Sequence, residues 1–159
     1  MRMKLIAHRG NINGPSKMAN KPSFIVSSLR LGYDVEVDVW YEKSWWLGHD
    51  EPQYEIDLQW LYEKRHRLWV HCKNWRALDQ LNNTKSTFRY FSINYFWHQD
   101  DDYTITSKGF PWVYPGKRIM PGCVCVLPEL SDSPYQTDEF NECYGVCSDF
   151  IERYKTCER

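Results

Sequence analysis

The residues of this sequence best suited to chemistry are histidines and acids that follow short apolar runs. His8 follows residues 5–7, and His49 follows a tryptophan-rich run. Glu36 and Asp38 alternate with valines, which places both carboxylates on one face of an expected strand. Carboxylates in this arrangement are natural ligands for a hard divalent cation. Histidines titrate near neutral pH, so two of them could share acid and base catalysis.

Three further residues add positive charge or another ligand to this set. Arg9 follows His8, while His71 and Lys73 stand two residues apart at the close of an apolar run. Arginine grips a phosphoryl group with two parallel hydrogen bonds, and lysine acts on it as a point charge. Cleavage of a phosphodiester needs such groups, because charge develops on the phosphoryl oxygens and the leaving alkoxide needs a proton. The residue types therefore predict phosphoryl chemistry.

The elements that must position these residues alternate between strands and helices along the chain. We expect strands over 4–7, 33–40, 45–47, 67–74, 88–94, 103–106, 112–114, 123–127 and 145–148. We expect helices from a cap at Asn20 to Gly32, from a cap at Asp57, from Trp75 to about residue 81, and near Phe150. This order predicts an α/β chain with parallel strand pairing.

Eight apolar strands, with the hairpin arm at 45–47 left out, predict an abridged TIM (β/α)8-type barrel. Barrels of this kind usually run to about 250 residues, whereas this chain has 159. Only five residues separate Thr106 from Trp112, too few for a helical crossover. Several helices of the C-terminal half are therefore expected to be shortened or missing. The polar residues at the carboxyl ends of the strands would meet at one mouth of the barrel.

The chain resembles the glycerophosphodiester phosphodiesterase family at three motifs that occur in the family's order and near its spacing. They are Ala7-His8-Arg9-Gly10, Val35-Glu36-Val37-Asp38-Val39 and Gly48-His49-Asp50. Residues 145–149 are also similar to the family's last strand, and the match is dense over roughly the first 75 residues. The resemblance implies one domain over residues 1–159, with His8 and His49 as the catalytic pair. It also implies a divalent metal on Glu36 and Asp38, and a phosphate held by Arg9.

One departure from the family affects the metal that is expected. The family usually places a metal-binding glutamate where this chain has His71, whereas Lys73, a candidate phosphate ligand, is retained. Carboxylates favour Mg²⁺ or Ca²⁺, but a ligand set that includes His71 suits Mn²⁺ or Zn²⁺ better. The spider sphingomyelinase-like phospholipases share a similar plan of residues. A phospholipase D-type lyase reaction that releases a cyclic phosphate therefore stays open.

A second group of polar and aromatic residues is expected to overhang the same mouth. Trp97 and Tyr103 could stack on a sugar or a glycerol-like group, with His98 or Lys108 near its phosphate. The alternative is a loop that packs aromatic side chains where helices are missing. Glu129 follows another expected strand and is a candidate substrate contact at the rim.

Composition and charge narrow the classes of partner. The net charge of −1 and a pI near 6.5 give no basic field for nucleic acid. No apolar run approaches the roughly 20 residues of a membrane span, and only three apolar residues precede His8, too few for a signal peptide. We therefore expect a cytoplasmic protein with a small-molecule phosphodiester substrate, no nucleic acid partner and no stable membrane insertion. Its oligomeric state is left open.

Six cysteines are expected to be reduced and mostly buried, because the chain carries no export signal. The alternative is a zinc site made of Cys123, Cys125, Cys143 and Cys147, although their spacing fits no standard zinc knuckle.

The residues as a whole predict a phosphoric diester hydrolase. A non-catalytic barrel that binds a phosphorylated sugar or a lipid head group at the same mouth is the alternative. The two histidines favour the enzyme, because a binding module needs neither an acid nor a base. The replacement at His71 favours the binding module.

Overall fold

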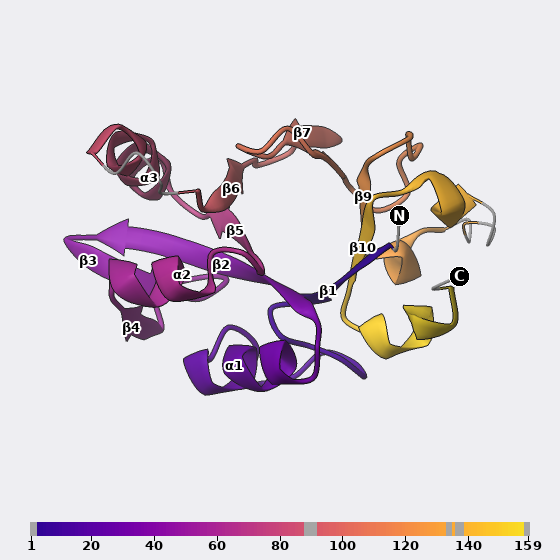
Figure 1. The fold of residues 1–159 in the computed structure, drawn as a ribbon, viewed down its shortest axis with the longest axis horizontal. Helices are drawn as coiled ribbons and strands as arrows, with labels where there is room; N and C mark the ends of the chain where they lie inside the picture. Colours follow the sequence, from indigo (N-terminus) through magenta and orange to yellow (C-terminus); the bar gives the residue numbers. More distant parts are fainter. Residues whose placement is uncertain (1–2, 88–91, 133–134, 136–138, 158–159) are drawn as a thin grey trace.

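The computed structural model describes residues 3–87, 92–132, 135 and 139–157. In this part of the chain, ten strands form one mixed sheet (Figure 1). The strands are β1 (Lys4–His8), β2 (Asp34–Glu42), β3 (Ser44–Leu47), β4 (Tyr54–Ile56), β5 (Leu68–Cys72), β6 (Asn94–Trp97), β7 (Tyr103–Ile105), β8 (Pro111–Val113), β9 (Val124–Val126) and β10 (Gly145–Ser148). The helices are α1 (Pro22–Arg30), α2 (Leu58–Lys64), α3 (Trp75–Thr87) and the 3₁₀ helices η1 (Pro128–Leu130), η2 (Glu139–Glu142) and η3 (Ile151–Cys157).

Most of the sheet is parallel, in the strand order β6-β5-β2-β1-β10-β9-β8. β3 pairs antiparallel with the far half of β2, β4 with β3, and β7 with β8. The chain is therefore a mixed α/β protein, as the alternation of strand and helix signals predicted. The antiparallel pairing of β7 and β8 follows from their short connection, which leaves no room for a crossover helix.

The helices differ from the sequence expectation at two places. α3 continues past residue 81 to Thr87, because neither glycine nor proline stands there to end it. The next strand, β6, accordingly begins at Asn94 rather than at residue 88, and residues 88–91 lie outside the described part of the chain. Lys21, and not Asn20, is the N-cap of α1 and makes no side-chain cap. In the described residues after α3, the helices are the short 3₁₀ segments alone, which agrees with the expected loss of helices there.

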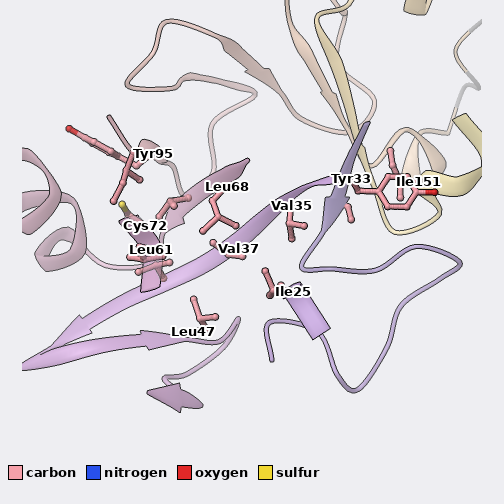
Figure 2. Packing of buried hydrophobic residues seen from close by; sticks show 14 of the residues in the cluster. Ile25, Tyr33, Val35, Val37, Leu47, Leu61, Leu68, Cys72, Tyr95 and Ile151 are labelled. Carbon is pink, nitrogen blue, oxygen red and sulfur yellow. The ribbon is translucent and has the colours of Figure 1, made fainter. Parts of the chain in front are cut away.

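Two clusters of buried side chains cover opposite faces of the sheet. The larger cluster holds the valines of β2, with Ile25 of α1 and Leu61 of α2 against them (Figure 2). The smaller cluster contains Ile6, Trp69, Phe96, Trp112, Val124, Val126 and Cys147. Successive side chains of a strand point to opposite faces, so Glu36 and Asp38 share the face of the smaller cluster. Both acids are buried, at 2% and 0% exposure.

The sheet curves around the smaller cluster (Figure 1). Phe96 of β6 and Trp112 of β8 stand at the two ends of the parallel run, yet their ring centroids are 4.5 Å apart. The N–H of Ser107, just after β7, also donates to the carbonyl oxygen of Tyr95 in β6 over 2.7 Å. Ring contacts therefore connect the two ends of the parallel run, and this hydrogen bond ties β6 to the segment that follows β7. No described helix is both long enough and apolar enough to cross a membrane.

Candidate active site

The structure brings most of the predicted site residues to one cavity of about 380 Å³. Those that line it are His8, Arg9, Glu36, His49, His71, Lys73 and His98. β1, β2 and β5 are parallel neighbours, with His8 opposite Glu36 and Asp38 opposite His71. The carboxyl ends of these three strands therefore bring these side chains together, and the neighbouring Asp38 is fully buried.

Asp38 is the central acceptor of the site. Its Oδ2 accepts a hydrogen bond from Asn20 Nδ2 at 2.8 Å and lies 2.8 Å from Arg9 Nε. Its Oδ1 lies 3.0 Å from His71 Nδ1 and 3.8 Å from Lys73 Nζ. Burial alone would raise the pKa of this carboxyl, but the hydrogen bond with His71 and the charge of Arg9 outweigh it and hold the pKa below its usual value.

Glu36 lies beside Asp38 but has fewer close hydrogen-bond donors and positive charges around its carboxylate. Its Oε2 accepts a hydrogen bond from the backbone N–H of Arg9 at 3.2 Å, and the nearest histidine nitrogens, on His8 and His71, are each 3.8 Å from its carboxylate. Burial, followed by the negative charge of Asp38, raises the pKa of Glu36. Among the described residues, the ion-pair partners of Glu36 are histidines rather than lysine or arginine, so a bound cation would favour its charged form.

Glu36, Asp38 and His71 form a donor set that could hold a divalent ion. One ligand atom each from Glu36, Asp38 and His71 lies within 4.8 Å of the other two, the one such group of potential metal ligands found among the described residues. The 3.0 Å contact between His71 Nδ1 and Asp38 Oδ1 is a hydrogen bond, so His71 would ligate an ion through Nδ1 only after that nitrogen had lost its proton. Asp38 could offer Oδ1 to an ion while Arg9 and Asn20 hold Oδ2. The mixed nitrogen and oxygen set suits Mn²⁺ or Zn²⁺ as well as Mg²⁺.

His8 is oriented by an acid from the far end of the chain. Its Nδ1 lies 2.8 Å from Asp149 Oδ1, and Asn11 Nδ2 donates to the same oxygen at 2.7 Å. Burial would raise the pKa of Asp149, but its hydrogen bond with His8 outweighs that and lowers it. An ionised carboxylate at Nδ1 favours the tautomer with the proton on Nδ1, which leaves Nε2 on the side of Glu36 free to accept a proton. The sequence identified Asp149 only as the end of a family-like strand.

His49 reaches the cavity from the turn between β3 and β4. Gly48 shapes this turn, because a Cβ at that position would come within 2.0 Å of the Glu51 carbonyl oxygen. The His49 side chain is 43% exposed, and its Nδ1 lies 2.7 Å from Asp50 Oδ1. Burial and the nearby charge of Arg9 lower its pKa, so its protonated form is a stronger acid than a free imidazolium.

His98 and two aromatic residues form the other wall of the cavity. The His98 ring stacks on His71 with a centroid distance of 4.5 Å and lies 4.0 Å from the ring of Tyr114. Burial and the neighbouring His71 lower the pKa of His98 to about 4, so this imidazole is neutral at physiological pH. Four further residues complete the lining: Gln99, Trp112, Val126 and Leu127. This wall is consequently uncharged.

Four candidates from the second group lie outside the cavity. Trp97 points to the opposite face of β6 from Phe96 and lines a groove with Leu78 of α3 and Ile105 of β7. Tyr103 is exposed, and its hydroxyl donates to the carbonyl oxygen of Arg118. Lys108 is exposed in the turn before β8. Partial burial lowers the pKa of Lys108 most, and the nearby charge of Arg65 lowers it further. Glu129 accepts hydrogen bonds from Ser148 Oγ and the backbone N–H of Asp149, so it holds the residue that orients His8.

The five described cysteines are buried, and the four candidate zinc ligands among them do not all face the same side of the sheet. The five thiols that the structure describes are free, and their burial agrees with the expectation for them; the Cys157 side chain lies outside the described residues. Cys125 belongs to the larger cluster and Cys147 to the smaller one. Because these two thiols face opposite sides of the sheet, the four cysteines cannot share one zinc ion.

Comparison with known proteins gave no match among family models, curated proteins or solved structures. The function is therefore argued from the site itself.

Proposed function

We propose that this chain is a metal-dependent phosphodiesterase, similar to the glycerophosphodiester phosphodiesterases, that hydrolyses a glycerophosphodiester or a related small phosphodiester. One observation carries the proposal: the two candidate catalytic histidines, one buried acid and two cationic side chains line a single cavity, and a second buried acid, Asp38, pairs with both cations. Each of these groups has a distinct part in phosphodiester cleavage. A structural cluster of charges would have no need for a second histidine at the rim.

We propose that the curved sheet is an abridged barrel of the (β/α)8 type. The contact between Phe96 and Trp112 across the smaller cluster supports this, because it joins the two ends of the parallel run. In such barrels the site lies at the carboxyl ends of the strands. The cavity has this location on β1, β2 and β5.

The phosphoryl group of the substrate would bind between Arg9 and Lys73. Asp38 holds both cations in place, with Arg9 Nε at 2.8 Å and Lys73 Nζ at 3.8 Å from its oxygens. Arg9 adopts a left-handed backbone conformation with φ of 55°, which costs energy for a residue with a Cβ. Backbone strain of this kind is commonly found at functional sites.

His8 would act as the base and His49 as the acid. The Nε2 of His8 would take the proton from the attacking water, or from a neighbouring hydroxyl of the substrate. The more exposed His49, with its lowered pKa, would give a proton to the leaving oxygen. A divalent ion on Glu36, Asp38 and His71, whether Mg²⁺, Ca²⁺, Mn²⁺ or Zn²⁺, would polarise the phosphoryl group and offset its charge.

We propose a small-molecule substrate and a cytoplasmic location. The cavity has a volume of about 380 Å³, which suits a small diester. The alcohol part of the substrate would lie against the uncharged wall, which is formed by His98, Tyr114, Trp112 and Leu127. The free thiols of the described cysteines agree with a reducing compartment.

The test is turnover of a panel of glycerophosphodiesters and an aryl diester with each of the four ions. Wild type is compared with His8→Ala and His49→Ala, and with His66→Ala as a matched control, because His66 is exposed and does not line the cavity. Metal-dependent turnover that both site variants lose and the control keeps would support the proposal. A folded wild type that binds phosphate monoesters by calorimetry but turns over no diester would instead indicate a binding module. A cyclic phosphate in the phosphorus NMR spectrum would indicate the lyase reaction.

A further inference from the structure

A pair of thiols lies well away from the candidate active site. Cys123 directly precedes β9, and Cys143 lies two residues before β10. Their sulfur atoms are 3.7 Å apart. Both residues belong to the larger buried cluster, with exposures of 0% for Cys123 and 8% for Cys143.

The backbone holds these two cysteines in register. The N–H of Tyr144, next to Cys143, donates to the carbonyl oxygen of Cys123 at 2.8 Å. Gly145 then pairs with Val124 in the parallel ladder of β9 and β10. A disulfide has a sulfur–sulfur bond of about 2 Å, so the two sulfur atoms would need to approach by less than 2 Å. These backbone pairings keep the two cysteines next to each other.

The two thiols differ in their ease of ionisation. The hydrogen bond with Cys143 lowers the pKa of Cys123 to about 7, while the same contact and burial raise the pKa of Cys143. A thiolate is the reactive form of cysteine towards oxidants, and a neighbouring thiol can then resolve the oxidised product. The burial of Cys123 favours an oxidant no larger than a few atoms.

We propose that Cys123 and Cys143 form a reversible disulfide when the protein meets hydrogen peroxide. The Cys123 thiolate attacks a peroxide oxygen and the O–O bond breaks. Hydroxide departs, and Cys123 becomes a sulfenic acid. The Cys143 sulfur then displaces the sulfenic hydroxyl, which takes the thiol proton and departs as water. The two thiols supply two electrons, which reduce one peroxide. A dithiol reductant reverses the reaction.

Cys125 provides a matched control. It is buried in the same cluster and lies in β9, two residues after Cys123, but burial raises its pKa to about 12. It should therefore remain a thiol while the proposed pair is oxidised. The crosslink would join the amino ends of β9 and β10, opposite to the cavity, so its detection does not depend on phosphodiester turnover.

The experiment treats folded protein with a few equivalents of hydrogen peroxide, alkylates the remaining thiols after denaturation and maps the peptides by mass spectrometry. In wild type and in Cys125→Ser, the Cys123 and Cys143 peptides should be found linked, with a mass lower by two hydrogens, and dithiothreitol should release them. In Cys143→Ser, Cys123 should form no link, and any oxidation of it should appear as added oxygen rather than as a loss of two hydrogens. Two thiols that stay open to alkylation in the oxidised wild type, or a link to any other cysteine, would overturn the proposal. The wild-type map decides this even where a variant folds poorly.

Discussion

Asn20 supports the candidate site through a contact that can be removed without touching the cavity lining. Strand β1 ends at His8, so the backbone N–H of Asp38 lies beyond the last residue of β1 that pairs with β2. Asn20 Oδ1 accepts that N–H at 3.0 Å, and Asn20 Nδ2 donates to Asp38 Oδ2 at 2.8 Å. Asn20 itself has a φ of 63°, in the left-handed region. Glycine adopts this conformation freely, so Asn20→Gly removes the two hydrogen bonds without adding backbone strain.

The size of the effect follows from these two bonds. An unpaired buried N–H costs about 1–3 kcal/mol, and a hydrogen bond to a charged group contributes about 1.5–3 kcal/mol. The variant should therefore lose about 3–4 kcal/mol of unfolding free energy. For a chain of this size, 1 kcal/mol shifts the Tm by about 2–4 °C, so we expect a fall of roughly 10 °C.

Thermal unfolding followed by circular dichroism measures this change. Lys43→Gly is the matched control, because Lys43 also has a left-handed φ, of 64°, but lies exposed in the turn between β2 and β3. It gains the same chain freedom in the unfolded state and loses no buried hydrogen bond, so its Tm should change by no more than about 3 °C. If Asn20→Gly and Lys43→Gly lower the Tm equally, Asn20 does not support Asp38 and the reasoning is refuted.

Three further predictions concern the site. Glu36→Gln should weaken Mn²⁺ binding by at least about 10-fold in calorimetry without lowering the Tm of the ion-free protein, because burial already disfavours the Glu36 charge; unchanged affinity would remove Glu36 from the ligand set. Asp149→Asn should lower kcat/KM by about 10²–10⁴-fold, because an amide no longer favours the reactive tautomer of His8, and wild-type rates would contradict this role. The pKa of His98 is lower in the folded protein, so its contribution to stability is present above pH 6.5 and lost as the pH falls towards 4. His98→Phe, which keeps the ring contact with His71, should therefore lose less Tm than wild type between pH 7 and pH 5, and equal losses would contradict the low pKa.

Local patterns predicted the residues at the ends of the first strands. The period of two in β2 places Glu36 and Asp38 together, and short apolar runs before His8 and His71 mark the ends of β1 and β5. The alternation alone leaves open whether the acids face water or the interior. The structure places them in the interior, because the sheet curves around the face of β2 that carries them (Figure 1).

Contacts between distant parts of the chain were beyond prediction from the sequence. Asp149 meets His8 across 141 positions of sequence, and no local pattern pairs the two. Asn20 is a residue type that often caps helices, so the sequence suggested a cap rather than its contact with Asp38. Which of Trp97 and His98 faces the cavity depends on the register of β6, because adjacent residues of a strand point to opposite faces. An expected strand that ended at residue 94 could not supply that register.

The leaving-group dependence of turnover tests the division of labour between the two histidines most directly. Wild type, His8→Ala and His49→Ala are compared on two diesters that differ only in the leaving group, an alkoxide or a nitrophenolate. A nitrophenolate departs without a proton, so His49→Ala should lose about 10²–10⁴-fold on the alkyl diester and little on the nitrophenyl one. His8→Ala should lose activity on both. Equal losses of His49→Ala on the two diesters, or full activity of His8→Ala, would contradict the proposed acid and base.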